Sequence, residues 1–290
     1  MAAARRRFRL KLPHLRPLVL GKRTLLMGAL NVTPDSFSDG GLYYTRDAAI
    51  ARGIEMEEEG ADIIDVGGES TRPGSELVSA AEEMRRILPV IAGLRRRLRI
   101  PISVDTYKAE VAEAAVHAGA EIINDISGLR FDANLADVAK RLGTPLVLMH
   151  IRGQPKTMQQ GSFAKNVLRD VLSGLQASLR RARAAKLSRS QLVVDPGIGF
   201  GKSAEQNLEL LAHLEKLVVL GCPILVGPSR KSFIGKVLDP EGPGLPPAER
   251  IWGTAAAVTT AILHGAHIVR VHDITQIAQV ARLADAILAA

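Results

Sequence analysis

A unit that repeats eight times after residue 24 constrains the fold more than any other feature of the sequence. In each unit a short apolar run ends in polar or glycine residues, and a longer segment of helical periodicity follows. Strict alternation of strands and helices predicts a parallel sheet with right-handed crossovers. Eight such units within 290 residues predict an α/β protein of the (β/α)8 TIM barrel type. The expected strands are Leu25–Leu30, Asp62–Val66, Ile102–Val104, Glu121–Ile123, Leu146–Met149, Leu192–Val194, Ile224–Val226 and Ile268–Val271.

The same alternation leaves one alternative architecture. A doubly wound sheet would also alternate strands and helices, but it places ligand-binding groups beside a switch point. It is disfavoured here because polar residues end every strand. The helices expected between the strands are Arg46–Glu59, Ala80–Leu98, Lys108–His117, Ala133–Leu142, Phe163–Lys186, Ala204–Leu220, Ala248–Leu263 and Ile274–Leu288.

The first 23 residues are expected to form an extension that precedes a single barrel domain, residues 24–290. Apolar and basic residues alternate over residues 8–12, and the apolar runs Leu18–Leu20 and Thr24–Met27 flank a Gly-Lys-Arg segment. This pattern predicts a small β-hairpin.

Charge and composition disfavour several classes of partner. The formal net charge is +8 and the pI about 9.9, which would suit nucleic acid, a membrane surface or a small anion. The basic clusters that follow residue 90 lie late in expected helices, where cations suit the helix dipole, and no nucleic-acid-binding motif accompanies them. No run reaches the ~18 apolar residues that cross a bilayer. The expected partners are therefore small molecules, not nucleic acid or a membrane.

The expected location is the cytoplasm. The arginine-rich N-terminus lacks the apolar core of a secretory signal, although an organellar transit peptide is an open alternative. The single cysteine, Cys222, forms no internal disulfide, which fits a reducing compartment.

Polar side chains follow each expected strand. In a barrel of this type the carboxyl ends of the strands meet at one mouth, where active sites lie. A single polar group at such an end often caps a helix, but polar groups at all eight ends predict a site. They are Asn31, the segment from Gly67 to Pro73, Asp105, Asn124 with Asp125, His150, Asp195, the segment from Ser229 to Lys231, and Arg270 with His272.

The types of these side chains indicate the ligand. Asp105, Asn124 and Asp195 offer planar hydrogen-bonding groups that match the edge of a nitrogenous heterocycle. The cations Arg72, Lys231 and Arg270, with His272 and Asn31, suit a phosphate and its metal ion. The residues themselves thus indicate a polar heterocycle beside a phosphorylated group.

A glycine-rich turn follows the sixth strand, over Asp195 to Ser203. It fails the P-loop pattern because proline stands at 196, and it fails the dinucleotide-binding pattern because lysine stands at 202. Its glycines are expected to let the backbone approach a flat ligand. Phe200 fits either stacking on a ring or packing in the core.

The motifs at these positions resemble those of the dihydropteroate synthase family, which binds pterins. They are ALNVTPDSFSDGG, DVGGESTRPG, SVDTYK, INDISG, LMH with GQPKTMQ, VDPGIGFGK, GPSRKSFIG and VRVHD, and they occur in family order from about Thr24 to the C-terminus. The resemblance implies a barrel that condenses 6-hydroxymethyl-7,8-dihydropterin diphosphate with 4-aminobenzoate. The products would be 7,8-dihydropteroate and diphosphate, by an SN1-like substitution (EC 2.5.1.15).

The resemblance also implies roles for individual residues. The catalytic residues would be Asp105, Lys231 and, when the first loop closes, Asp35, and Mg²⁺ would bridge the diphosphate oxygens beside Asn31. The binding residues implied are Asp105, Asn124, Met149, Asp195, Phe200 and Lys231 for the pterin, Asn31, Arg270 and His272 for the diphosphate, and Phe37, Thr71, Arg72, Pro73 and Ser229 for 4-aminobenzoate. The resemblance further implies a homodimer and competition by sulfonamides.

Other functions remain open from the sequence. A pterin-binding corrinoid methyltransferase shares the barrel and the heterocycle-binding residues but needs no diphosphate site. A catalytically silent paralogue would keep the same motifs. An RNA-binding protein would use the basic charge alone, and its binding would weaken steeply with salt.

Overall fold

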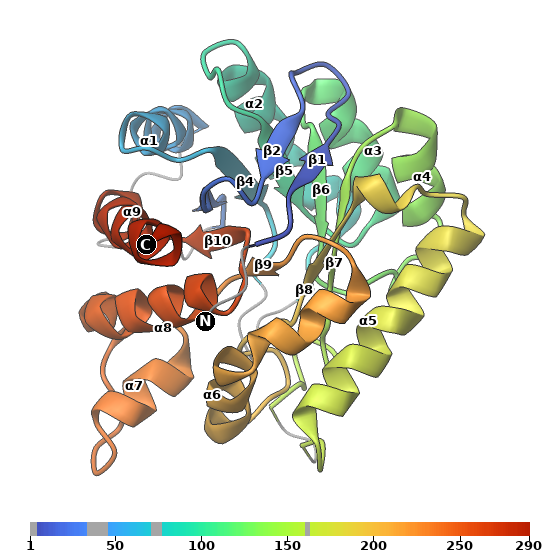
Figure 1. Cartoon of the computed structure of the whole chain (residues 1–290). Coiled ribbons are helices and arrows are strands. Elements are labelled where there is room, and N and C mark those ends of the chain that lie inside the picture. Colours follow the sequence, from blue (N-terminus) through green and yellow to red (C-terminus); the bar gives the residue numbers. More distant parts are fainter. Residues whose placement is uncertain (1–4, 34–45, 71–76, 160–162) are drawn as a thin grey trace.

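The computed structural model describes residues 5–33, 46–70, 77–159 and 163–290. Eight parallel strands form one sheet in the order β8-β7-β6-β5-β4-β3-β10-β9. A parallel bridge from Val194 to Ile224 joins the two outermost strands, so the sheet closes into the predicted barrel, with helices around it (Figure 1). The strands are β3 Leu25–Asn31, β4 Ile63–Gly67, β5 Ile102–Asp105, β6 Ile122–Asp125, β7 Leu146–Met149, β8 Leu192–Asp195, β9 Leu225–Val226 and β10 Ile268–Val271.

The helices follow the predicted order with two differences. A helix that the sequence pattern did not predict, α7, follows β9, and the expected helix Ala204–Leu220 breaks at His213 into α6 and a 3-10 helix over Leu214–Leu220. No helix in the described part of the chain combines the length and the apolar character of a membrane span. The helices are α1 Arg46–Glu58, α2 Ala80–Arg95, α3 Ala109–Ala118, α4 Leu135–Leu142, α5 Val167–Ala184, α6 Ala204–Ala212, α7 Ser232–Leu238, α8 Ile251–Leu263 and α9 Ile274–Ala289.

A small antiparallel hairpin precedes the barrel, as predicted, but its turn lies elsewhere. Strand β1 (Phe8–Leu10) pairs with β2 (Leu18–Leu20), so the connection between the strands spans residues 11–17 and not the Gly-Lys-Arg segment. From Leu25 onwards the chain pairs within the barrel instead. The limit between an extension of residues 1–23 and a domain of residues 24–290 stays a prediction.

The hairpin closes one end of the barrel interior. Its buried residues Leu10, Leu12 and Leu20 pack in one cluster with side chains from the first half of seven barrel strands. These barrel residues are Leu25, Met27, Ile63, Ile122, Val147, Val193, Leu225 and Ile268. The amino-terminal end of the barrel is therefore filled with apolar side chains, and ligands have to enter from the opposite end.

Strand alternation places polar groups above this apolar layer. Side chains two positions apart on a strand point to the same face. Because Ile63, Ile122, Val147, Val193 and Ile268 point inwards, the residues two positions after them do so as well. Those residues are Asp65, Asn124, Met149, Asp195 and Arg270. The barrel interior thus changes from an apolar to a charged layer within two residues.

Candidate active site

The carboxyl ends of the strands carry most of the predicted site residues. Asn31, Asp105, Asn124, Met149, Asp195 and Arg270 lie in or at the ends of six strands, and Phe200, Ser229, Lys231 and His272 lie in the segments that follow β8, β9 and β10. The predicted residues Asp35, Phe37, Thr71, Arg72 and Pro73 lie outside the described residues.

Asp65 of β4, which the sequence pattern did not single out, bonds two of the predicted residues, and one of these bonds a third. Its Oδ2 accepts from Nδ2 of Asn124 at 2.9 Å and from Nε of Arg270 at 2.6 Å. Nη2 of Arg270 donates to Oδ2 of Asp105 at 2.9 Å. Oδ1 of Asp65 is buried with no hydrogen-bond partner among the described residues.

This network fixes the orientation of Asn124. Because its amide nitrogen donates to Asp65, its carbonyl oxygen is presented as an acceptor on the other side. The sequence signal for Asp65 was a carboxylate inside the otherwise apolar strand IIDVG. A search restricted to strand ends passes over such a residue.

Burial shifts the pKa values of the two carboxylates that are predicted to bind the pterin. Desolvation raises the pKa of Asp105 to about 7, against the opposing charge of Arg270. Desolvation likewise raises the pKa of Asp195 to about 6, although its Oδ1 accepts from the backbone N–H of Gly197 at 2.6 Å. Both carboxylates titrate near neutral pH, so hydrogen-bond donors from a ligand would stabilise their charged forms.

The glycine-rich turn after β8 is built around a buried lysine. Nζ of Lys202 donates to the carbonyl oxygens of His150, Gly197 and Phe200 at 3.2, 2.9 and 3.0 Å. Gly197 has a φ of +68°, and a Cβ there would lie 2.0 Å from the carbonyl oxygen of His150. Glycine at 197 and lysine at 202 thus hold the turn tightly against the end of β7.

An apolar wall stands beside the charged layer. Nζ of Lys231 lies 4.2 Å from the centroid of the Phe200 ring, which joins the charged and apolar sides of the mouth. The wall is an apolar surface of the kind against which a ring would pack, and the carboxylates offer hydrogen-bond acceptors. It consists of Ile126, Met149, Ile151, Met158 and Phe200, with Tyr107 and Phe131 packed against it.

A cationic region lies at the ends of β9 and β10. Oγ of Ser229 lies 2.9 Å from Nδ1 of His272, so residues predicted for two different substrates touch. Burial first, and then the charges of Arg270, Arg230 and Lys231, lower the pKa of His272 to about 3. A neutral imidazole in a positive field can donate or accept, and the field itself favours an anion.

A cavity of about 410 Å³ opens beside this region, between α1 and the start of α9. Asn31 and His272 line it together with Arg230 and Asp273, which form an ion pair. Two of the three residues predicted to hold the diphosphate, Asn31 and His272, thus lie in the wall of the cavity, whereas Arg270 does not line it.

Two strand-end residues turn away from the mouth, contrary to the sequence analysis. The ring of His150 lies against Gly174 of α5, with Nε2 3.5 Å from Oδ2 of Asp170. The carboxylate of Asp125 accepts from the backbone N–H groups of Ser127 and Leu129 in its own turn. Strand alternation explains both, because Met149 and Asn124 occupy the inward positions.

The donor groups fit a weakly held Mg²⁺. No group of three or more His, Cys, Asp or Glu side chains that would hold a metal is found among residues 5–33, 46–70, 77–159 and 163–290. Mg²⁺ at phosphate sites takes few protein ligands and several oxygens from phosphate and water. Asn31 lines the cavity, and its side chain carries an amide oxygen of the kind that this mode of binding uses.

Comparison with known proteins assigns the family. The model that describes pterin binding enzymes matches residues 27–272. Dihydropteroate synthase of Synechocystis sp. is 50% identical over 267 residues, 92% of this chain and 91% of that protein. The structure of the Xanthomonas albilineans enzyme with 4-aminobenzoic acid is 42% identical with a TM-score of 0.89, and it covers 98% of this chain and 100% of its own. That of the Yersinia pestis enzyme with a sulfonamide drug complex is 40% identical with a TM-score of 0.90 and the same coverage. The chain therefore belongs to the pterin binding enzyme family and, within it, to the dihydropteroate synthases.

Proposed function

We propose that this chain condenses 6-hydroxymethyl-7,8-dihydropterin diphosphate with 4-aminobenzoate, as a dihydropteroate synthase. The observation that carries the proposal is the connected layer of Asp65, Asp105, Asn124 and Arg270 beside an apolar wall. Such a layer matches a flat heterocycle that has several ring donors. The cationic region alongside it matches an ionised leaving group.

Binding of the pterin rests on Asn124 and Asp195. The fixed amide of Asn124 offers a carbonyl acceptor, and the Asp195 carboxylate accepts from ring N–H groups. The apolar wall covers one face of the ring. Because both polar side chains are about 95% buried, their contacts with the ring exclude water.

In the reaction the bond between the pterin methylene carbon and the diphosphate oxygen breaks, and its electron pair leaves with the diphosphate. The amino nitrogen of 4-aminobenzoate then forms the new bond to that carbon and loses a proton to solvent. Ionised Asp105 would stabilise the positive charge that develops on the ring, while Arg270 and His272 would bind the leaving group. Lys231, above Phe200, would lie between the two substrates.

Mg²⁺ would be held by Asn31 and by the diphosphate oxygens. It supplies charge neutralisation to the leaving group. Asp35, predicted to join the site on loop closure, and Phe37, Thr71, Arg72 and Pro73, predicted for 4-aminobenzoate, remain sequence predictions. Ser229 is the described member of the predicted 4-aminobenzoate pocket.

The test is a direct assay of the reaction. Purified protein with the pterin diphosphate, Mg²⁺ and 4-aminobenzoate should release diphosphate and form dihydropteroate in equal amounts. Omission of 4-aminobenzoate is the control, since hydrolysis alone yields diphosphate without dihydropteroate. A sulfonamide should lower the rate in competition with 4-aminobenzoate. Failure to form dihydropteroate in the complete mixture rejects the proposal.

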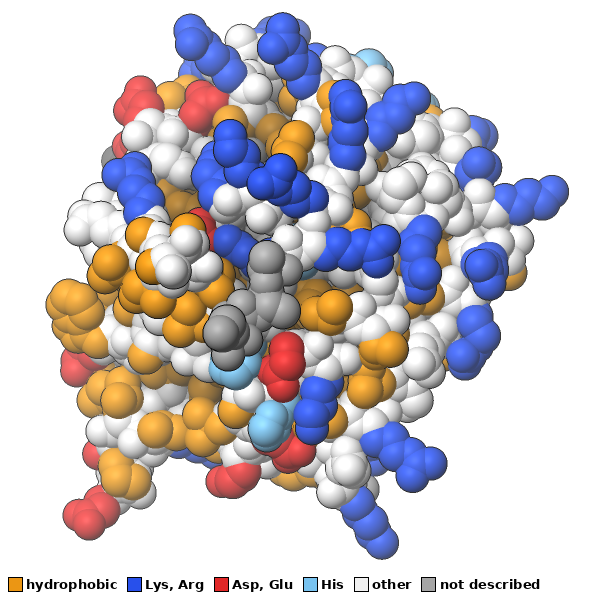
Figure 2. All heavy atoms as spheres, in the orientation of Figure 1, with side chains coloured by type: hydrophobic (Ala, Val, Ile, Leu, Met, Phe, Trp, Pro, Cys, Tyr) orange, Lys and Arg blue, Asp and Glu red, His pale blue; other side chains and the backbone are white. Residues whose placement is uncertain are grey.

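A homodimer and a cytoplasmic location complete the proposal. Figure 2 shows hydrophobic side chains gathered over α8 and α9, whereas Lys and Arg side chains are scattered over the upper and right-hand parts of this face. Trp252, Leu283 and Ile287 on these helices are 79%, 66% and 55% exposed, which favours a second copy of the chain as a partner. Light scattering would measure the mass, and Trp252→Arg should shift it towards the monomer. The free, buried Cys222 suits a reducing compartment.

A further inference from the structure

We propose that Lys108 is a positioning residue for 4-aminobenzoate, because it joins the two ends of the segment that carries Thr71, Arg72 and Pro73. This inference rests on the proposed function. Lys108 lies three residues after Asp105, in the short connection between β5 and α3. The sequence motif SVDTYK includes it, but no role in the reaction was assigned to it above.

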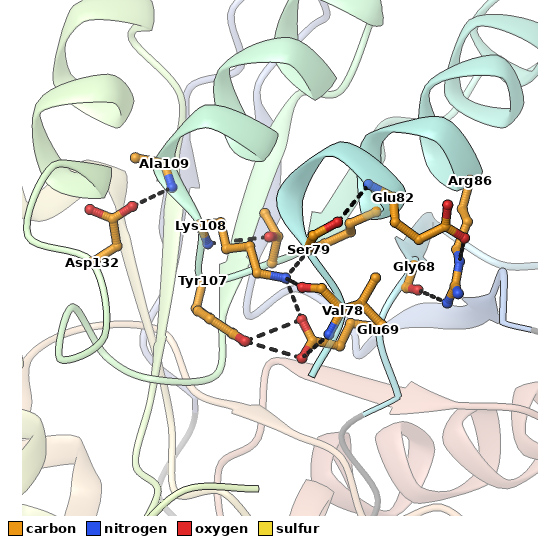
Figure 3. Close-up of polar contacts among 12 residues, drawn as sticks. Gly68, Glu69, Val78, Ser79, Glu82, Arg86, Tyr107, Lys108, Ala109 and Asp132 are labelled. Atoms are coloured by element: carbon orange, nitrogen blue, oxygen red, sulfur yellow. Dashed lines mark hydrogen bonds and ion pairs between the residues drawn. The ribbon is translucent and has the colours of Figure 1, made fainter. Parts of the chain in front are cut away.

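The ammonium group of Lys108 has three partners (Figure 3). It donates to Oε2 of Glu69 at 2.5 Å, to Oε2 of Glu83 at 2.6 Å and to the carbonyl oxygen of Val78 at 2.7 Å. Glu69 stands just before the segment of residues 70–77, and Val78 stands just after it. A single side chain from another strand end thus fixes both ends of the segment relative to each other.

A second residue of the same connection strengthens this contact. The hydroxyl of Tyr107 lies 3.1 and 3.2 Å from the two carboxylate oxygens of Glu69. The Tyr107 ring also packs edge-on against Phe131, with centroids 5.3 Å apart. Since both rings pack against the apolar wall of the mouth, the segment ends are tied to the predicted pterin side of the site.

Lys108 is itself held rigidly. Its backbone N–H donates to Oγ1 of Thr106 at 3.3 Å, and the next N–H, of Ala109, donates to Oδ2 of Asp132 at 2.8 Å (Figure 3). The start of α3 is therefore fixed at the point from which the lysine reaches out. A rigid support is what a device for positioning a substrate-binding segment requires.

Burial makes the contacts strong. The side chains of Glu69, Glu83 and Lys108 are 7%, 1% and 16% exposed. Removal of one partner from a buried ion pair leaves an uncompensated charge, which is strongly unfavourable. The segment ends would then have to move so that water could reach Glu69 and Glu83. Pterin binding should change less than 4-aminobenzoate binding, because Asp105, Asn124 and Asp195 have no hydrogen bond or ion pair with this group among the described contacts. One link is electrostatic, since the charge of Glu83 helps to raise the pKa of Asp105, and Tyr107→Phe leaves Glu83 paired with Lys108.

The experiment compares Lys108→Met and Tyr107→Phe with Glu113→Gln. Glu113→Gln is the matched control, because it removes an ion pair with Arg141 on the outside of the same helix, α3. At saturating pterin diphosphate, the KM for 4-aminobenzoate should rise about tenfold or more in Lys108→Met and less in Tyr107→Phe. The pterin affinity, measured by calorimetry, should stay within about twofold in Tyr107→Phe and should fall less than the 4-aminobenzoate affinity in Lys108→Met, and the control should match the wild type.

The possible outcomes separate this inference from the proposed function. An unchanged KM for 4-aminobenzoate, or an equal loss of pterin affinity, overturns the positioning role while wild-type activity stands. If Lys108→Met does not fold, Tyr107→Phe decides, because it keeps the ion pairs and removes one hydroxyl. A wild-type protein that forms no dihydropteroate overturns the proposed function instead.

Discussion

Asp195→Asn should weaken pterin binding and stabilise the unliganded protein at the same time. An amide cannot accept two N–H bonds as a carboxylate does, and the loss of a contact with a buried charged group costs about 1.5–3 kcal/mol. The affinity for an unreactive pterin should therefore fall by a factor between about 10 and about 150. Calorimetry measures this directly.

The gain in stability follows from the pKa of Asp195. Burial raises it from 3.8 to about 6, so the folded state binds the proton more tightly than the unfolded state. The contribution of Asp195 to the wild-type free energy of unfolding therefore falls as the pH rises from about 4 to about 6, by about 3 kcal/mol, and then stays level. Asparagine removes this dependence. Some of this gain in stability is lost, because the hydrogen bond from the Gly197 N–H to an amide oxygen is weaker than the bond to a carboxylate. A net gain of about 1–2 kcal/mol is expected above pH 6.

The matched control is Asp125→Asn. Burial also raises the pKa of Asp125 to about 6, but its carboxylate faces its own turn. This variant should keep the pterin affinity of the wild type. The reasoning is refuted if Asp195→Asn binds the pterin as tightly as the wild type. It is also refuted if the difference in melting temperature between Asp195→Asn and the wild type persists at about pH 3, where the wild-type carboxyl is protonated in the folded state and mostly protonated in the unfolded state.

Three further predictions concern other parts of the molecule. Asp35→Ala should keep pterin affinity and lower kcat, since loop closure serves the chemical step; a wild-type kcat would count against this. Because the pKa of Asp105 is raised to about 7 and its ionised form is the one proposed to act, kcat/KM should rise with pH up to about 7, and a profile flat from about pH 5 would exclude that role. Leu12→Ala should cost about 2–5 kcal/mol of stability in denaturant unfolding without a change in either KM, because Leu12 packs only at the closed end of the barrel.

Most of the barrel could be predicted because its strands are short apolar runs that end abruptly. The strand pattern located all eight strands, and five of them extend one or two residues further than expected. One ends at Gly67, and the other four end at the polar residues Asn31, Asp105, Asp125 and Asp195. These extensions share a cause, since each polar residue continues the backbone pairing while its side chain serves the mouth or a turn. Helix α7 was missed because its seven residues are too few to establish a helical period.

The site was predicted less completely than the fold, because the prediction used the position of each residue along its strand and not the direction of its side chain. His150 and Asp125 stand at strand ends but point away from the mouth, whereas Asp65 stands inside its strand and points into it. Lys202 was considered only as a residue that breaks a dinucleotide-binding pattern. Its contacts with three carbonyl oxygens depend on where the ends of β7 and β8 meet, which no local pattern reveals.

The charged layer destabilises the folded protein when no ligand is bound, and a ligand would offset this cost. Asp105 and Asp195 have raised pKa values because burial removes water that no protein donor fully replaces, and Oδ1 of Asp65 is buried without a partner among the described residues. A pterin brings several N–H donors to this layer, so its binding should lower the pKa values of both aspartates. Well above pH 7 both aspartates are already ionised, so ligand binding releases no proton. Near pH 6 they are partly protonated, and binding releases protons from them. Stabilisation by the pterin should therefore grow as the pH rises through that range, in the same interval in which the unliganded protein loses stability.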